Sequence, residues 1–331
     1  MDADRNLLVE SLEKIAPEDI EVHGGKATNL AKLSLKGFQI PQGFSISCIN
    51  FSNMISDLPE ISIALKQVEK TDDFEEMISL SERIQKQIRS YRIPTNLRVE
   101  IEKNYHQLQN NGVDFEVGYA VRSSATIEDR NDISFAGQAE SCLCVRGVSH
   151  ILKAMKRVWQ STFSPSAMIY LKTKGISLNQ VRMAVVVQEM IPARISGVIF
   201  TANVVNNNAE EMLVNATWGW GEALVSGKVN PDTFVLKKNP LSVIQKHLGQ
   251  KQLTCVSSRI DDNMHTVLEE TPQSKRGVFT LEDHELFELA ELCLNIESDM
   301  GKPQDIEWCI TSDGKPVILQ TRPITTLNVL L

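Results

Sequence analysis

Four polar side chains near the end of the chain are of the types that bind phosphates and Mg²⁺. The four are Asp305, Glu307, Gln320 and Arg322. A guanidinium binds phosphate oxygens through paired hydrogen bonds, and carboxylate and amide oxygens are ligands that suit Mg²⁺. The residues therefore suit a metal ion with a polyphosphate, provided that the fold brings them onto one surface. The alternative is a solvated sheet face with a cross-strand salt bridge.

The segment that carries these residues predicts a β-hairpin. Asp313 and Gly314 lie between two apolar runs, and Asp-Gly favours a two-residue type I′ turn because both central residues of that turn have positive φ. With that loop the pairs are Ser312 with Lys315, Thr311 with Pro316, Glu307 with Gln320, and Asp305 with Arg322. Because side chains alternate between the faces of a strand, the four polar residues then share one face.

The composition excludes several classes of protein. Of the 331 residues, 42% are hydrophobic and 23% charged, and the formal net charge of -8 argues against general nucleic-acid binding. The N-terminus has no apolar stretch behind basic residues, and no uncharged apolar run approaches the roughly twenty residues of a membrane helix. The six cysteines and six histidines are scattered. We therefore expect reduced thiols, a cytoplasmic location, no membrane segment and no transition-metal site.

A Gly-Gly-Lys triplet ahead of a predicted helix offers a first phosphate contact. Glycines let backbone N–H groups approach an anion, the helix dipole favours negative charge, and Lys26 adds a positive charge. The spacing of a Walker A loop is missing, and most such triplets are plain turns.

Two further segments contain groups that suit phosphate oxygens. Arg122 ends a predicted strand and is followed by the hydroxyls of Ser123 and Thr126, which can donate to phosphate while the guanidinium clamps it. The alternative is an ordinary helix N-cap. Gly137 and Gln138 end a loop of small residues that suits a lid over phosphates, or simply a connection to the next strand.

Two segments suit the rest of a nucleotide. Gln188, Glu189 and Ile191 end a predicted buried strand that bends at a proline, which offers backbone groups and an apolar wall to an adenine ring. An ordinary buried strand and turn is the alternative. Glu222 follows a Gly-rich turn and either faces the nucleotide or supports the first turn of a helix.

The elements that position these residues are expected to form two lobes, residues 1–190 and residues 191–331. In the first lobe we expect two helices around a Gly-rich loop, a helical insert over about 50–115, strands at 119–122, 139–145 and 181–190, and a helix over 148–172. In the second we expect strands at 197–201 and 212–216, a poorly patterned mobile connection over 245–280, and a helix over 281–300 before the hairpin.

Taken together and in this order, the segments resemble the N-terminal nucleotide-binding domain of phosphoenolpyruvate synthase (pyruvate, water dikinase) and, still more closely, that of rifampin phosphotransferase. The matching stretches are GGKATNLAKL, VRSSATIEDRNDISFAGQ, VVVQEMIPARISGVIFTAN, ATWGWGEALVSG and GKPQDIEWCITSDGKPVILQTRPITTL. They span about residues 20 to 327. The resemblance implies an α+β fold of the ATP-grasp type, in which two α+β lobes hold ATP.

The resemblance also implies roles for single residues. Lys26 and Arg122 would bind the ATP phosphates, Gln188, Glu189 and Ile191 would line the adenine pocket, Glu307 and Gln320 would hold Mg²⁺, and Arg322 would contact the terminal phosphates. Lys26, Arg122 and Arg322 are the expected catalytic residues. In the resembling enzymes a swivelling domain carries a histidine that receives phosphate from ATP, and a further domain binds the acceptor. Both are missing from this chain, and none of its six histidines lies in a carrier-loop context.

The function expected from these observations is an Mg²⁺- and ATP-dependent phosphotransferase domain of the dikinase type. It would pass a phosphoryl or pyrophosphoryl group from ATP to a histidine on the swivelling domain, supplied in cis or in trans. Two alternatives belong to other classes. One is a non-catalytic nucleotide-binding or regulatory module. The other is a ligase that activates a carboxylate as an acyl phosphate, although no carboxylate pocket is visible in the sequence.

Overall fold

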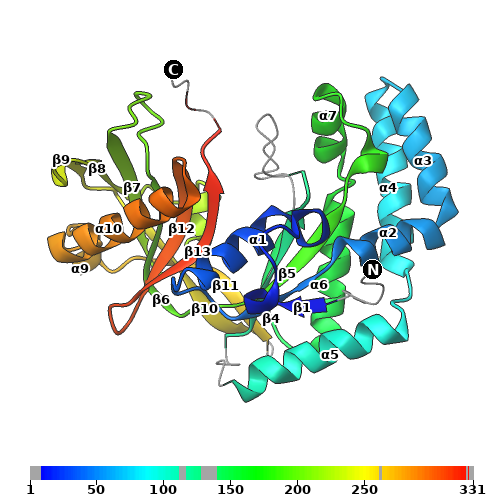
Figure 1. The fold of residues 1–331 in the computed structure, drawn as a ribbon, viewed down its shortest axis with the longest axis horizontal. Coiled ribbons are helices and arrows are strands. Elements are labelled where there is room, and N and C mark those ends of the chain that lie inside the picture. Colours follow the sequence, from blue (N-terminus) through cyan, green and yellow to red (C-terminus); the bar gives the residue numbers. More distant parts are fainter. Residues whose placement is uncertain (1–8, 112–116, 128–139, 261–262, 326, 328–331) are drawn as a thin grey trace. The chain divides into compact units, whose positions relative to one another are not determined.

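The computed structural model describes residues 9–111, 117–127, 140–260, 263–325 and 327, and the chain divides into two compact units (Figure 1). Unit 1 comprises Met1–Lys32 and Gln42–Met190, and unit 2 comprises Leu33–Pro41 and Ile191–Leu331. The segment Leu33–Pro41 was expected in the first lobe. It belongs to unit 2 because Leu33 packs in that core and the carbonyl oxygen of Gln39 accepts a hydrogen bond from the Ile318 N–H at 3.0 Å.

Unit 1 is built on a five-stranded antiparallel sheet. The strand order is β1 (Val9–Ser11), β2 (Gly43–Ile46), β5 (Met183–Glu189), β3 (Tyr119–Ala125) and β4 (Ser141–Val145). The central strand β5 is buried at six of its seven positions, as its unbroken apolar run indicates.

Helices cover one face of this sheet and bury its apolar side chains in a single core. They are α2 (Cys48–Asp57), α3 (Pro59–Lys70), α4 (Phe74–Ser90), α5 (Thr95–Asn110), α6 (Val148–Ser161) and α7 (Pro165–Thr173), with short 3₁₀ turns at Leu12–Lys14 and Leu178–Gln180. The single helix expected over 148–172 is two helices, because Ser164 caps a new helix that has Pro165 in its first turn. In α4, Phe74 is exposed, whereas Met77, Ile84 and Ile88 are buried.

Unit 2 contains a six-stranded antiparallel sheet. Its order is β13 (Pro316–Pro323), β12 (Gln304–Thr311), β6 (Ala193–Phe200), β7 (Glu211–Trp218), β8 (Asp232–Lys237) and β9 (Ser242–His247). The helix α10 (Asp283–Met300) contributes Leu286, Leu289 and Cys293 to a core that also contains Ile306 and Trp308 of β12. One face of the sheet is thereby buried against α10.

The expectation of a mobile connection over 245–280 is wrong. Strand β9 ends inside this segment, and β10 (Leu253–Ile260) and β11 (Asn263–Glu270) then form a two-stranded antiparallel ribbon with eight paired positions. Short helices α8 (Glu222–Val225) and α9 (Gln273–Arg276) precede and follow this ribbon. Serine and threonine occupy both faces of the ribbon, so its sequence lacks the apolar alternation by which half-buried strands are recognised. No helix in the described parts of the chain is long and apolar enough to cross a bilayer.

The terminal hairpin, β12 with β13, forms with a different turn from the one expected. The Gly314 N–H donates to the Thr311 carbonyl oxygen at 3.1 Å, and the Thr311 N–H donates to the Lys315 carbonyl oxygen at 3.1 Å. The loop is thus a three-residue loop in which only Gly314 has positive φ. Near the turn the register is shifted by one residue, so that Ile310 rather than Thr311 is opposite Pro316.

A β-bulge restores the expected register farther along the hairpin. The pairing shifts between Glu307 and Trp308, so that Leu319 is the extra residue on β13. Beyond the bulge Glu307 is opposite Gln320 and Asp305 is opposite Arg322. The two pairs that carry the polar side chains are therefore confirmed, although the pairs nearest the turn are wrong.

The helix α1 (Ile20–Leu35), which belongs to unit 1 as far as Lys32, is broken at a glycine. Gly24 has φ 73° and ψ 173°, and the helix resumes after it. A Cβ atom at this position would overlap the backbone carbonyl of Ser124 on β3. Both the left-handed φ and the close approach to β3 therefore require glycine here.

We expect Gly24→Ala to destabilise unit 1 more than Gly175→Ala does. Gly175 has a similar φ of 69° but nothing within 4 Å of its Cβ position, so it carries only the left-handed backbone strain of about 1 kcal/mol. Gly24→Ala adds a backbone overlap and should cost at least about 2 kcal/mol more. Urea unfolding followed by far-ultraviolet circular dichroism measures both losses, and equal losses would contradict the predicted crowding.

Candidate functional site

The polar side chains of the terminal hairpin lie on one face of the unit 2 sheet. Asp305 and Glu307 alternate with Ile306 and Trp308, which are buried in the core beneath α10. The polar pair therefore faces away from α10, and Gln320 and Arg322 lie opposite it on β13. The prediction that the four residues share a face is confirmed.

Asp305 and Arg322 form an ion pair on this face. The Arg322 Nε donates to Asp305 Oδ2 at 2.8 Å, and the guanidinium Nη2 lies 2.6 Å from the same oxygen. Burial raises the pKa of the Asp305 carboxyl, the Arg322 guanidinium opposes that rise, and the charge of Glu307 adds to it. The cross-strand salt bridge of the alternative is thus present, but a solvated face is wrong for Asp305, whose exposed fraction is 8%.

Asp305 thus orients the guanidinium of Arg322, a role that sequence reasoning did not assign. The signal for it was present, since the expected register already placed Asp305 opposite Arg322. A fixed guanidinium loses less side-chain freedom when it binds a ligand than a mobile one does.

The amide oxygen of Gln320 is the most informative atom of the site. It is buried and has no hydrogen-bond partner among the described residues. A buried acceptor without a partner costs about 1–3 kcal/mol, so such atoms usually serve a ligand or an ion. Glu307 lies directly across the strands from Gln320. A carboxylate beside an amide oxygen suits Mg²⁺, which takes one or two protein oxygens and completes its shell with phosphate and water.

The neighbouring strands extend this face with further polar residues that sequence reasoning missed. Val198 of β6 is opposite Glu307, and Asn215 of β7 is opposite Val198. The Thr233 Oγ1 donates to the Asn215 Oδ1 at 2.9 Å. Thr217, two residues farther along β7, is buried, and its hydroxyl has no hydrogen-bond partner among the described residues. The alternation of Asn215 and Thr217 along β7 was the signal that could have located them.

In unit 1, the sheet face opposite the helical core carries Arg122 and Gln188. Arg122 of β3 pairs with Val186, and Ala120 pairs with Gln188, so both polar side chains belong to the same face of the sheet. The broken helix α1 is bound to this face by Ser124, whose hydroxyl bonds to the backbone of His23 and Ala27. The structure therefore brings the segment that contains Lys26 to the strand that carries Arg122.

The other predicted residues of unit 1 are distributed differently. Strand alternation assigns Ser123 to the face of Val121 and Ala125, which pack in the helical core, so Ser123 is not on the face of Arg122. Thr126 is buried just after β3, and its N–H donates to the Arg182 carbonyl oxygen at 3.2 Å. Gly137 and Gln138 lie outside the described residues.

The residues of the predicted adenine wall lie at the end of β5 and in the segment that follows it. Glu189 exchanges hydrogen bonds with Gln42, through its N–H at 2.8 Å and through its carboxylate, which accepts from the Gln42 N–H at 3.3 Å. Gln188 is buried beside it, whereas Ile191 belongs to unit 2. In unit 2, Glu222 is exposed at the start of α8, with Cys255 Sγ 3.8 Å from its carboxylate. The assignments of these residues to the nucleotide remain predictions.

His23 is a buried titratable residue on the polar face of unit 1. Its Nδ1 is 3.1 Å from Ser45 Oγ, and its Nε2 is 3.3 Å from Glu10 Oε2. Burial lowers the pKa of His23 to about 4, and the charge of Asp19 opposes this shift. The imidazole is therefore neutral at pH 7.

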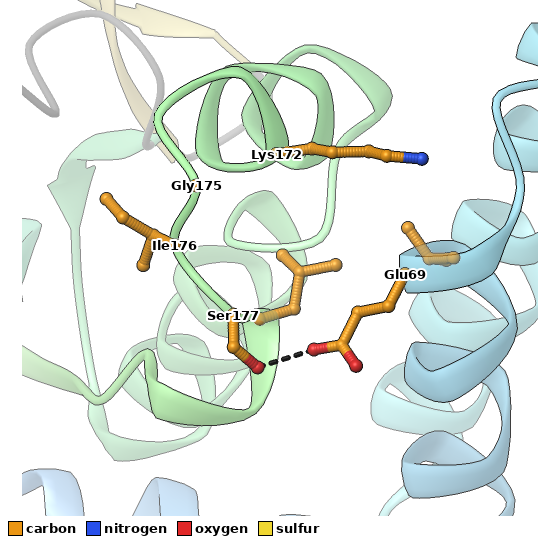
Figure 2. A pocket seen from close by; sticks show the side chains of 7 residues that line it. Glu69, Lys172, Gly175, Ile176 and Ser177 are labelled. Atoms are coloured by element: carbon orange, nitrogen blue, oxygen red, sulfur yellow. Dashed lines mark hydrogen bonds between the residues drawn. The ribbon is translucent and has the colours of Figure 1, made fainter.

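A separate pocket of about 270 Å³ lies in the helical part of unit 1 (Figure 2). It is lined by Glu69, Lys172 and Ser177 among others, and it contains none of the predicted site residues. Lys172 is 2.7 Å from Asp72, and the Ser177 hydroxyl donates to Glu69. Since these polar groups bond to one another, the pocket offers little to a charged ligand.

The fold and the polar faces together define a nucleotide-binding α+β protein. The family model for the pyruvate phosphate dikinase AMP/ATP-binding domain matches residues 20–329. The chain belongs to this family. The predictions of an ATP-binding domain and of an α+β fold are thereby confirmed, and the ATP-grasp type of that fold stays a prediction.

Curated relatives support the family assignment. A probable phosphoenolpyruvate synthase of Methanocaldococcus jannaschii is 34% identical over 320 residues, covering 96% of this chain and 26% of that protein. The rifampicin phosphotransferase of Bacillus subtilis is 34% identical, with 97% and 36% covered. The phosphoenolpyruvate synthase of Pyrococcus furiosus is 32% identical, with 96% and 43% covered. The chain thus spans less than half the length of each of these three relatives.

A solved structure adds no argument on the fold. The D-alanine–D-alanine ligase from Coxiella burnetii aligns over 95% of this chain and 50% of that chain, with a TM-score of 0.36 and 9% sequence identity. That similarity is too low to decide a fold.

Because burial depresses the pKa of His23, the folded chain should lose stability as the pH falls. The stabilising contribution is complete above the unfolded pKa of 6.5 and is lost as the pH falls through the folded pKa of about 4. Within that window the loss approaches about 1.4 kcal/mol per pH unit. His23→Gln should therefore flatten the pH dependence of the unfolding midpoint between pH 6.5 and 4. His106→Gln, at an exposed histidine, is the control, and an unchanged slope in His23→Gln would contradict the assignment.

Proposed function

We propose that this chain is a phosphotransferase domain that binds Mg²⁺ and ATP and passes a phosphoryl or pyrophosphoryl group to a histidine on another domain. The family model supports ATP binding, and the relatives include enzymes named phosphoenolpyruvate synthase and rifampicin phosphotransferase. The observation that carries the metal-dependent part is the buried Gln320 oxygen, which lacks a hydrogen-bond partner among the described residues and lies opposite Glu307.

The residues of unit 2 would serve the phosphates of ATP. Glu307 and Gln320 would hold Mg²⁺, which neutralises charge on phosphate oxygens when it is bound. Arg322, oriented by Asp305, would contact the terminal phosphates through its guanidinium. Glu222 would lie near the nucleotide.

The residues of unit 1 would bind the phosphates and the adenine of ATP. Lys26 and Arg122 would bind phosphates and stabilise charge that shifts during transfer. Gln188, Glu189 and Ile191 would line the adenine pocket. Ser123, Thr126, Gly137 and Gln138 would add further phosphate contacts, although the strand position of Ser123 faces the core.

The proposed partners are a swivelling domain that carries the receiving histidine and a domain that binds the final acceptor. The support is the length of the relatives, of which this chain covers between 26% and 43%. We also propose a cytoplasmic location. All six cysteines are buried among the described residues, and none of them forms a disulfide bond, as in a reducing compartment.

Isothermal titration with ATP should distinguish the contribution of the metal ligand Gln320 to ATP affinity from that of the Arg322 guanidinium. Arg322→Ala should weaken ATP binding about 10–100-fold, the equivalent of about 1.5–3 kcal/mol for charged hydrogen bonds. Gln320→Leu should weaken binding when Mg²⁺ is present and leave the Mg²⁺-free affinity unchanged. It should not lower the stability of the nucleotide-free protein, because it removes a buried acceptor that has no partner among the described residues.

Lys238→Ala is the matched control for this titration. Lys238 forms an ion pair with Glu297 of α10 at 2.7 Å, on the opposite side of the sheet from the site. Its removal should leave the affinity for ATP within about twofold, since distant sites are independent. No binding by the wild-type chain, or equal binding by wild type and Arg322→Ala, would refute the site.

Phosphate transfer in trans should distinguish the enzyme from a regulatory module. A histidine-carrying domain from a relative is mixed with the chain, Mg²⁺ and ATP that is radiolabelled on the β- or γ-phosphate. Label should appear on that histidine with wild type and with Lys36→Met, but not with Lys26→Met. Lys36 is a suitable control because it is paired with Asp299 of α10 at 3.0 Å. Tight ATP binding without label would favour the non-catalytic module.

A further inference from the structure

One buried hydroxyl connects the broken helix α1 to strand β3 in unit 1. Ser124 Oγ donates to the His23 carbonyl oxygen at 2.7 Å and accepts a hydrogen bond from the Ala27 N–H at 3.2 Å. The side chain of Ser124 is fully buried. Its two bonding partners are four residues apart and flank the segment that contains Lys26.

These two bonds give side-chain partners to backbone groups on either side of the helix break. The first N–H groups of a helix have no carbonyl within the helix to bond, and a side chain usually caps them from the preceding residues. Here the helix resumes after Gly24, and the cap for Ala27 comes from a different strand. The carbonyl oxygen of Gly24 accepts from the Thr28 hydroxyl at 2.9 Å, which completes the turn.

The hydrogen bonds of the Ser124 hydroxyl require α1 and β3 to approach each other closely. Gly24 lies so near the Ser124 backbone that no side chain fits between them. Ser124 is two residues from Arg122 on the same face of β3, and Ala27 follows Lys26 directly. The hydrogen-bonded hydroxyl therefore links the backbone next to Lys26 to the strand that carries Arg122.

We propose that Ser124 is a positioning residue that sets the place of Lys26 relative to Arg122 for binding phosphate. This inference rests on the proposed function, because it assumes that both cations bind the phosphates of one nucleotide. Without the hydroxyl, the His23 carbonyl and the Ala27 N–H lose their partner, and the segment of Lys26 is held less firmly against β3. Two cations that are not held in register bind a polyphosphate less tightly.

The test is a double-mutant cycle read by titration with Mg²⁺-ATP and with adenosine. Ser124→Ala should weaken ATP binding about tenfold, equivalent to about 1.4 kcal/mol, and leave adenosine binding within about twofold. In the Lys26→Met background the same change should have almost no further effect, because the residue that it positions is gone. Equal weakening of ATP and adenosine, or full additivity with Lys26→Met, would overturn the proposal.

Ser81→Ala is the matched control. Ser81 is also a buried serine of unit 1, its hydroxyl donates to the Phe163 carbonyl oxygen at 2.6 Å, and it accepts from Gln85 Nε2 at 2.9 Å. Its loss should reduce stability without any preference for ATP over adenosine. If Ser124→Ala unfolds too readily for titration, Ser124→Cys replaces it with the same expectations, since a thiol is nearly isosteric and a weak hydrogen-bonding group.

Hydrogen exchange of the nucleotide-free chain separates this inference from the proposed function. In Ser124→Ala the Ala27 amide should exchange at least about tenfold faster, whereas amides of α4 should keep their wild-type rates. If the wild-type chain binds no ATP, the proposed function is refuted. The positioning role of Ser124 is then refuted as well, even if the Ala27 amide exchanges faster in Ser124→Ala. If wild type binds ATP but the Ala27 amide is unaffected, only the positioning role of Ser124 is refuted.

Discussion

Side-chain alternation along antiparallel strands is the constraint on which both polar faces depend. In unit 1 the odd-numbered residues of β3 enter the helical core, so Arg122 and Ser124 must face the other way. In unit 2 Ile306 and Trp308 are buried beneath α10, so Asp305 and Glu307 must do the same. Burial of the apolar side chains on one face of each strand is strongly favourable. This burial fixes the polar side chains on the opposite face, even where they make no favourable contacts of their own.

The polar face of unit 2 also contains buried groups that cost stability in the absence of a ligand. The Gln320 oxygen lacks a hydrogen-bond partner among the described residues, and burial disfavours the charged form of Asp305. Such groups are tolerated where a ligand later satisfies them, and the rest of the unit compensates for them. The arrangement is consistent with membership of an ATP-binding family, whose ligand brings phosphate oxygens.

Local sequence rules were weakest where two irregularities compensated for each other. The loop at Gly314 is one residue longer than Asp-Gly favours, and the bulge beside Glu307 adds one residue to β13, so the far end of the hairpin returns to the expected pairing. A turn rule counts residues but does not detect a bulge, which depends on how the strands pack. The ribbon β10–β11 was missed because most of its side chains are polar on both faces.

The sequence by itself determined the family, the α+β class, the strands with strong apolar patterns and the shared face of Asp305, Glu307, Gln320 and Arg322. These follow from residue order and from the two-residue period of strands, which are local properties. Only the tertiary structure decided that Asp305 orients Arg322, that the Gln320 oxygen is buried without a hydrogen-bond partner among the described residues, and that Ser124 connects α1 to β3. Burial and hydrogen bonding between residues far apart in the chain depend on packing, and no short stretch of sequence contains that information.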